Sequence, residues 1–220
     1  RTLYVKSNGE ILCNDDYCER VSLGWCRQAS SDPGIYDVLN NAQYQNIRDA
    51  FTNDRVPWPG VCEKCSFFRP DEPHTNDLLQ EKIIEKIQFE ASLACALRCP
   101  MCSNLTQIQT RGGGRHFTPE MMAGLLQDLK DNDYQIRSLE YCGQGEPLNN
   151  PRFPELLAVG RRIYPDTLQR VITNGNHDFV KRIGSEFVEE TLVSIDGAFQ
   201  ESYEKYRVKG DISKAFEFMR

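Results

Sequence analysis

The sequence predicts an α/β protein with a parallel sheet, preceded by a small cysteine-rich domain. Two observations support this prediction. From residue 83 onward, segments with strand and helix character alternate, which is typical of parallel strands joined by crossover helices. Before residue 70 the segments are short and hold five of the nine cysteines. We therefore expect a cysteine-rich domain over 1–70, a linker over 71–82 and an α/β core over 83–220.

In the first domain, strands are expected over residues 2–6 and 10–12. Ser7-Asn8-Gly9 lies between them, and Asn-Gly favours a tight hairpin turn. Apolar side chains at helical spacing predict a helix over 41–51. The run Pro57-Trp58-Pro59-Gly60 then interrupts regular structure before a C-x2-C pair.

In the core, Thr118-Pro119-Glu120 has the composition of a helix start, with an N-cap, proline in the first turn and an acidic residue. The helix that begins there is expected to continue through Leu129. The remaining segments are strands over 83–90, 135–141, 168–173 and 191–195, and helices over 153–164, 177–183 and 213–219. Four strand–helix units are too few to close an eight-stranded barrel, which needs roughly 200 residues or more.

Charge and composition exclude some classes of function. The net charge of −6 argues against tight, electrostatically driven binding of nucleic acid. No run approaches the roughly 18 apolar residues of a membrane span, and no secretory signal is visible. We expect a cytoplasmic protein, where thiols stay reduced. The chain begins with Arg1 rather than Met, so we expect it to be a fragment of a longer protein.

Three cysteines lie close together in the run Cys95-Ala-Leu-Arg-Cys99-Pro-Met-Cys102. Thiolate is the usual outer ligand of each iron in a 4Fe-4S cluster. A C-x3-C-x2-C loop therefore caps three irons and leaves the fourth open for a small molecule. The residues alone leave two alternatives open, a zinc knuckle and a group of buried thiols.

This spacing resembles that of the radical S-adenosylmethionine (SAM) enzymes. The resemblance implies a partial (β/α)6 barrel whose last units are missing from this chain. It also implies that a 4Fe-4S cluster on Cys95, Cys99 and Cys102 binds SAM and cleaves it reductively, giving a 5′-deoxyadenosyl radical that abstracts hydrogen from a substrate. The implied partners are an external one-electron reductant, such as a flavodoxin or ferredoxin, and a peptide, protein or sugar-like substrate.

The resemblance extends to the ends of the predicted strands. Gly143-Gln144-Gly145-Glu146-Pro147 is similar to the family's GGE motif, which implies that Gly143, Gly145 and Glu146 receive the amino group of SAM. The alternative is a simple turn closed by glycine and proline. Met101 occupies a position that packs on adenine in the family.

Two further strand ends complete the implied pocket. Thr173, Asn174 and Asp196 correspond to residues that meet the ribose and carboxylate of SAM. The alternative is ordinary turn chemistry, since Asn-Gly and Asp-Gly are common after strands. Arg207 matches an Arg/Gly element of relatives, and the sequence leaves open whether it lines the site. Cys142 is expected to be a packed thiol at the floor of the pocket.

The N-terminal cysteines resemble the SPASM or twitch module, which carries auxiliary 4Fe-4S clusters. The resemblance implies Cys13, Cys62 and Cys65 as ligands. The fourth ligand lies upstream of Arg1 or is Cys18 or Cys26, with Cys18 a tentative choice. The alternative is a zinc ribbon. The rival to the enzyme hypothesis is thus a non-enzymatic zinc or iron–sulfur module for metal binding or electron transfer.

Overall fold

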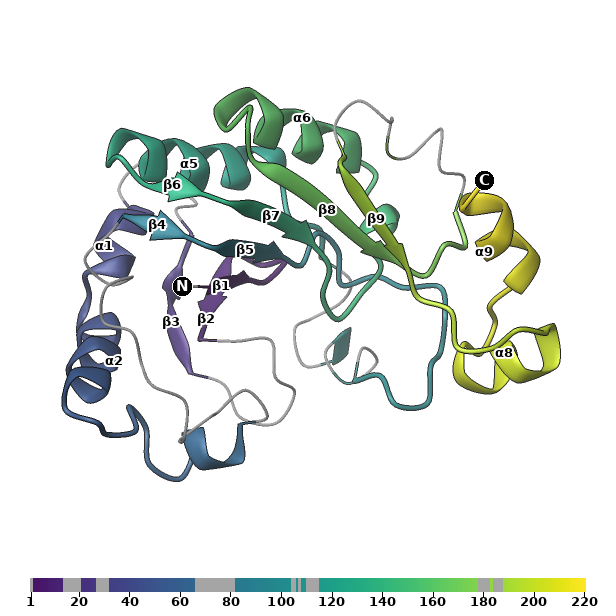
Figure 1. The fold of residues 1–220 in the computed structure, drawn as a ribbon, viewed down its shortest axis with the longest axis horizontal. Coiled ribbons are helices and arrows are strands. Elements are labelled where there is room, and N and C mark those ends of the chain that lie inside the picture. Colours follow the sequence, from purple (N-terminus) through teal and green to yellow (C-terminus); the bar gives the residue numbers. More distant parts are fainter. Residues whose placement is uncertain are drawn as a thin grey trace.

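The structure is a computed structural model, and it describes residues 2–13, 21–26, 32–65, 82–103, 106, 108–109, 115–177, 183 and 188–220. Its centre is a seven-stranded sheet in the order β3-β2-β1-β5-β7-β8-β9 (Figure 1). The strands are β1 (Thr2–Val5), β2 (Glu10–Leu12), β3 (Ser22–Trp25), β5 (Lys86–Phe89), β7 (Ser138–Tyr141), β8 (Leu168–Thr173) and β9 (Glu190–Val193). A separate parallel pair is formed by β4 (Ile83–Ile84) and β6 (Gln135–Ile136).

The predicted parallel core is present. β5, β7, β8 and β9 pair in sequence order, each parallel to the next. The strands expected over 83–90 and 135–141 are each divided in two. At the divisions, the Arg137 amide donates to the carbonyl of Ile84 and the Ser138 hydroxyl donates to that of Glu85. These cross-strand contacts occur where the chain steps from β4 to β5 and from β6 to β7. The α/β class is therefore confirmed. Among the described strands β3 and β9 are the two edges, and the partial barrel stays a prediction.

The N-terminal hairpin is part of the same sheet. β1 and β2 pair antiparallel, as the Asn-Gly turn predicts. β1 also lies parallel to β5, with Leu3 opposite Ile87 and Val5 opposite Phe89. The division into a domain over 1–70 and a core over 83–220 stays a prediction, and residues 71–81 of the expected linker lie outside the described residues.

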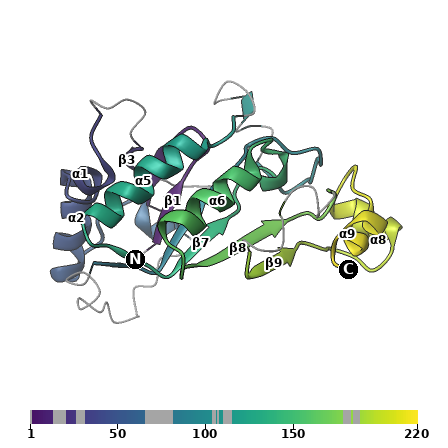
Figure 2. The ribbon, with the colours of Figure 1, turned by 90° about the horizontal axis from the view of Figure 1, so that it is seen from above.

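The helices lie mainly on one face and at the two ends of the sheet (Figure 2). α5 and α6 run side by side across the face, α1 and α2 lie at one end, and α8 and α9 at the other. Their bounds are α1 (Ile35–Leu39), α2 (Ala42–Thr52), α5 (Pro119–Asp131), α6 (Phe153–Ile163), α8 (Gln200–Tyr206) and α9 (Ile212–Phe218). Two short 3-10 turns are η1 (Cys62–Lys64) and η2 (Pro147–Asn149). No helix in the described ranges is long and apolar enough to cross a bilayer.

Local sequence explains where the predicted helices begin. Thr118 accepts a hydrogen bond from the Met121 amide through its hydroxyl, at 3.2 Å, with Pro119 as the first helical residue of α5. Asn41 accepts from the Tyr44 amide at 3.0 Å, so α2 begins one residue later than expected. The helix expected over 177–183 falls mostly outside the described residues. β3, α1 and α8 were not predicted.

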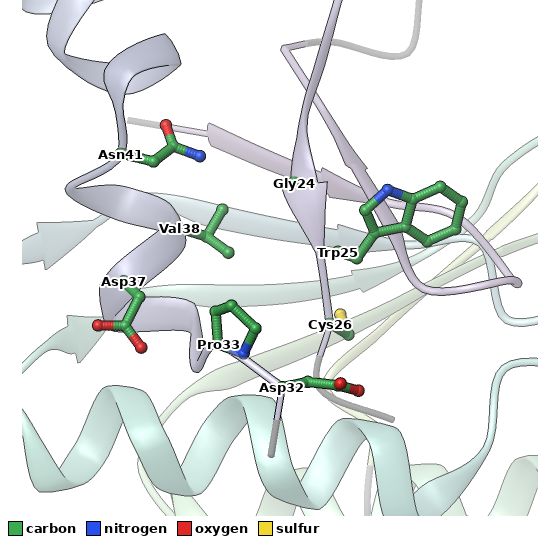
Figure 3. A pocket seen from close by; sticks show the side chains of 8 residues that line it. All are labelled: Gly24, Trp25, Cys26, Asp32, Pro33, Asp37, Val38 and Asn41. Carbon is green, nitrogen blue, oxygen red and sulfur yellow. The ribbon is translucent and has the colours of Figure 1, made fainter. Parts of the chain in front are cut away.

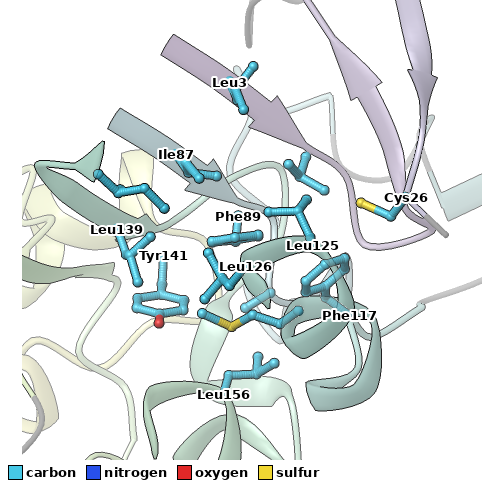
Figure 4. Close-up of a cluster of buried hydrophobic side chains, with 14 of the residues drawn as sticks. Leu3, Cys26, Ile87, Phe89, Phe117, Leu125, Leu126, Leu139, Tyr141 and Leu156 are labelled. Atoms are coloured by element: carbon cyan, nitrogen blue, oxygen red, sulfur yellow. The ribbon is translucent and has the colours of Figure 1, made fainter. Parts of the chain in front are cut away.

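The core is a layer between the sheet and helices α5 and α6. Phe89, Phe117, Tyr141 and Phe153 are each at most 1% exposed and form a series of ring contacts with centroids 5.3 to 6.0 Å apart. Figure 4 shows Leu3 of β1 in the same apolar cluster as these rings. The hairpin and the parallel strands therefore share one hydrophobic core, which fixes the hairpin against β5.

Candidate active site

A cavity of about 400 Å³ lies where the carboxyl ends of β7, β8 and β9 meet the loop that follows β5. It is lined by every residue predicted for the SAM pocket, namely Cys95, Cys99, Met101, Cys102, Gly143, Gly145, Glu146, Thr173, Asn174 and Asp196. The structure thus brings together residues from four separate strand ends. This edge is the one at which α/β folds bind ligands, because parallel strands present their carboxyl ends together.

Hydrogen bonds hold the cysteine loop at two points. The Ala94 amide donates to the Ser92 hydroxyl at 3.0 Å, and the Arg98 amide donates to the Val208 carbonyl at 2.9 Å. At the cavity wall, the side-chain amide of Asn174 donates to the sulfur of Cys95 at 3.8 Å. The sulfur of Cys102 lies 3.8 Å from the Gln144 carbonyl oxygen. Two of the three thiols therefore contact the strand-end motifs directly.

The three thiols of the cysteine loop are half-buried at the cavity wall. Within the described ranges, no three His, Cys, Asp or Glu side chains form a group able to hold one metal ion. Tetrahedral zinc needs ligands that converge on one point, whereas a cubane takes each thiolate on a different iron. Burial raises the pKa of Cys95 to about 11, with smaller contributions from Glu146 and the other two thiols. A thiol in this setting ionises when a bound cation supplies the compensating charge.

The glycines of the loop after β7 are required by packing. A Cβ on Gly145 would lie 2.1 Å from the Ser92 carbonyl oxygen, and one on Gly143 would lie 2.8 Å from Cβ of Glu90. The Glu146 amide donates to the Ala94 carbonyl at 2.9 Å, which holds this loop against the cysteine loop. The resemblance to the family implies close approach of a ligand at these glycines. In the structure Gly145 permits close approach of two backbone segments, and Gly143 leaves room for the side chain of Glu90.

Glu146 joins the ends of β7 and β8. It is 3% exposed and accepts from the Thr173 hydroxyl at 2.6 Å, the Asn174 amide at 2.8 Å and the Leu148 amide at 3.2 Å. Burial raises its pKa, and the hydrogen bonds oppose that rise. The carboxylate lies at the cavity wall with protein donors on both oxygens. Its role toward an amino group of SAM stays a prediction.

Arg207 adds a positive charge to the cavity lining, and its Nε donates to Oδ2 of Asp196 in an ion pair. The nearby Cys99 also acts electrostatically on the guanidinium, and Arg207 acts on Glu146. Arg207 therefore lines the cavity, a question the sequence left open. Ser194 and Tyr206 line it too and were not predicted, although Ser194 lies two residues before Asp196.

Met101 and Cys142 both line the cavity and differ in exposure. The Met101 side chain is 91% exposed at the rim, so its predicted packing on adenine would need a ligand to cover it. Cys142 lines the cavity and is half-buried, and its thiol contacts Oε1 of Glu140 at 3.5 Å. Both side chains remain accessible to a ligand in this cavity.

The match to a family model decides the assignment. A model described as a 4Fe-4S single cluster domain matches residues 92–218, which is more than half of the chain. The chain belongs to this 4Fe-4S family. The match confirms the prediction, made from the cysteine triplet, of a 4Fe-4S cluster as a cofactor. Membership of the radical SAM enzymes and SAM as a second cofactor stay predictions. The matched range includes the cysteine loop and the strand ends after β7, β8 and β9, and it excludes the N-terminal cysteines.

Comparison with solved structures gives a more distant likeness. BtrN, solved in complex with AdoMet and 2-DOIA, matches with a TM-score of 0.46 and 20% sequence identity. The match covers 59% of this chain and 55% of BtrN, so the chain spans about half of that protein. No curated protein matched the chain. The likeness to BtrN does not assign a substrate to this 4Fe-4S family member.

A second group of thiols lies in the N-terminal part of this 4Fe-4S family member. Burial raises the pKa of Cys13, and the nearby Cys65 and Cys62 raise it further. The Val21 amide donates to the Cys13 sulfur at 3.4 Å. Cys62 is the first residue of η1, and the Cys65 amide donates to the carbonyl of Cys62 at 3.0 Å. Because β2 runs antiparallel to β1, the chain at Cys13 leads away from the edge that holds the cavity.

The structure describes one of the two candidates for a fourth ligand of the auxiliary cluster. Cys18 lies outside the described residues. Cys26 is 3% exposed within the hydrophobic core, and burial raises its pKa to about 12. It also lines a cavity of about 610 Å³ between β3 and α1, together with Trp25, Asp32 and Asp37 (Figure 3). None of the residues predicted for the SAM pocket lines this second cavity.

Proposed function

We propose that the chain carries the SAM-cleaving site of a radical SAM enzyme that abstracts hydrogen from its substrate. One observation carries the proposal: the C-x3-C-x2-C loop and the ends of β7, β8 and β9 line a single cavity. When bound, the 4Fe-4S cluster supplies one electron that splits the sulfonium bond of SAM into methionine and a 5′-deoxyadenosyl radical, which takes a hydrogen atom from the substrate. An external one-electron reductant of the flavodoxin or ferredoxin kind would be the source of that electron.

The side chains of the cavity have distinct tasks in this proposal. Cys95, Cys99 and Cys102 hold three irons. Arg207 supplies a positive charge beside Cys99 that favours an anionic group of the ligand, such as the carboxylate of SAM. Leu97 and Ile172 give the cavity apolar walls that exclude water. The substrate is proposed to be a peptide, a protein side chain or a sugar-like molecule.

The test uses anaerobically reconstituted protein. Wild-type chain is expected to bind one SAM at the reduced cluster, change its EPR spectrum on addition of SAM, and release 5′-deoxyadenosine. Cys99→Ala should abolish both the change in the EPR spectrum on addition of SAM and the release of 5′-deoxyadenosine. Cys142→Ala is the matched control, because this thiol lines the same cavity and is not a predicted ligand. A reduced-cluster spectrum unaffected by SAM, or a tightly bound zinc ion in place of iron, would instead support the metal-binding or electron-transfer module.

We also propose that Cys13, Cys62 and Cys65 hold an auxiliary 4Fe-4S cluster, which accepts an electron from the substrate radical or anchors the substrate. The electrostatic coupling of Cys13 to the other two thiols supports this proposal. Cys62→Ala should lower the iron content by about one cluster and leave SAM cleavage in place. Cys142→Ala is the control, because this thiol is not a predicted ligand of either cluster. An unchanged iron content in Cys62→Ala would reject the auxiliary site.

A further inference from the structure

Glu90 is a fully buried carboxylate, and no motif of the sequence marks it as a functional residue. It directly follows β5 and is 0% exposed. It accepts hydrogen bonds from the Tyr4 hydroxyl at 3.2 Å, the Ser7 amide at 3.1 Å, the Ser7 hydroxyl at 2.8 Å and the Gln144 amide at 3.3 Å. The donors belong to three segments: strand β1, the turn of the N-terminal hairpin and the loop after β7. A buried carboxylate is costly unless donors surround it, so these segments are held around it.

The two oxygens of Glu90 divide these donors. Oε1 accepts both hydrogen bonds from Ser7 in the hairpin turn. Oε2 accepts from the Tyr4 hydroxyl and from the Gln144 amide. A displacement of the hairpin therefore moves the carboxylate against which the Gln144 amide is held.

The loop after β7 is shaped around this carboxylate. Gly143 leaves room for Glu90, since a Cβ there would lie 2.8 Å from both Cβ and Cγ of the glutamate. From Gln144 the contacts continue to the cavity: Glu146 of the same loop binds the Asn174 amide, and the Asn174 side chain reaches the sulfur of Cys95. An unbroken series of contacts thus joins the hairpin turn to the cluster loop.

We propose that Glu90 is a positioning residue for the SAM-binding loop of residues 143–146, and that the hairpin turn of residues 6–9 is a structural part of the SAM site. The inference rests on the proposed function. Glu90 does not line the cavity, so it acts through Gln144 and the backbone of the loop. The N-terminal segment then has a task at the SAM site that is separate from any cluster held by Cys13.

The experiment removes the donors to Glu90 one at a time. Tyr4→Phe deletes one hydroxyl donor, Ser7→Ala another, and Glu90→Gln replaces a carboxylate oxygen with an amide group. Tyr164→Phe is the matched control, since its hydroxyl donates to the Tyr134 carbonyl at 2.9 Å, away from the cavity. Each reconstituted protein is assayed for iron content, thermal midpoint and SAM dissociation constant, the last by EPR titration of the reduced cluster.

We expect Tyr4→Phe and Ser7→Ala to keep wild-type iron content and to weaken SAM binding about tenfold, the loss expected for one hydrogen bond to a charged group. At saturating SAM their spectra should match that of the wild type, because the cluster itself is unchanged. Tyr164→Phe should bind SAM as the wild type does, even where its thermal midpoint falls. Glu90→Gln should weaken SAM binding more than either donor variant.

Two outcomes would overturn the proposal. Wild-type affinity in both donor variants would make Glu90 a purely structural residue, and an equal loss in Tyr164→Phe would trace the effect to general destabilisation. If Glu90→Gln fails to fold, the donor variants still decide the matter. Failure of the wild type to bind SAM would reject the proposed function and this inference together, whereas failure of the variants to differ from it rejects the inference alone.

Discussion

Gly145 lies against the backbone of the cysteine loop, and replacing it with alanine tests how tightly the two loops are packed. The new Cβ would lie 2.1 Å from the Ser92 carbonyl oxygen, 2.5 Å from the Leu93 carbonyl carbon and 2.7 Å from Cα of Leu93. Ordinary contacts of a Cβ begin near 3.4 Å, so the loops must separate by more than 1 Å at the closest contact. All three obstructing atoms belong to the backbone and cannot swing aside as a flexible side chain does.

The loss of folding stability in Gly145→Ala follows from these contacts. Overpacking of a close-packed site costs about 1–3 kcal/mol, and backbone obstruction places Gly145→Ala at the upper end. The separation also breaks the hydrogen bond from the Glu146 amide to the Ala94 carbonyl, which adds about 1 kcal/mol. A loss of about 4 kcal/mol in a chain of this size lowers the melting temperature by roughly 10 °C.

The assay is thermal unfolding followed by circular dichroism under anaerobic conditions. The matched control is Gly124→Ala in α5, an exposed helical position where a Cβ meets no heavy atom within 4 Å. Removal of a helical glycine should stabilise the protein by about 0.5–1 kcal/mol. A melting temperature of Gly145→Ala within about 2 °C of the wild-type value would refute tight packing of the two loops, because so small a shift corresponds to a loss of less than about 1 kcal/mol.

Three further predictions concern titration, reactivity and stability. Hydrogen bonds from Arg152 hold the pKa of Glu120 at about 2. The interaction therefore stabilises the folded state at pH values above the ordinary pKa of 4.5, and this stabilisation is lost as the pH falls toward 2. Arg152→Ala should return that pKa to its ordinary range in an NMR titration, and an unchanged value would contradict the ion pair. Burial raises the pKa of Cys26 to about 12, so mass spectrometry should find it alkylated far more slowly in the native than in the unfolded chain, and equal rates would exclude burial. Thr173→Val removes a donor at 2.6 Å from the buried Glu146 and should cost about 1–3 kcal/mol in denaturant unfolding, whereas an unchanged midpoint would show that the carboxylate finds another donor.

The parallel core and the residues around the cavity were predictable from the sequence for a physical reason. Each strand of the core was identified by its own apolar pattern, and each was followed by polar residues such as Thr173 and Asn174. Parallel strands place their carboxyl ends along one edge, so motifs far apart in the chain meet there without any knowledge of the sheet order. The cap at Thr118 was predictable because an N-cap depends only on neighbouring residues.

Other features depend on contacts that leave no local pattern. The pairing of β1 with β5 joins segments more than 80 residues apart, and nothing in either strand specifies its partner. Glu90 reads as an ordinary polar residue at a strand end, and its buried role arises only when Tyr4, Ser7 and Gln144 surround it. α1 has five residues, too few for a helical repeat of apolar residues to be recognised.

The insertion of β1 beside β5 has a consequence for how the chain folds. The hairpin is formed by residues close in sequence, but its place in the sheet exists only after β5 has been synthesised. Pairing of such distant segments raises the contact order and slows folding. Until the hairpin docks, one side of β5 presents unpaired amides and carbonyls, a template for pairing with another chain. N-terminal truncation of this protein is therefore expected to promote aggregation through β5.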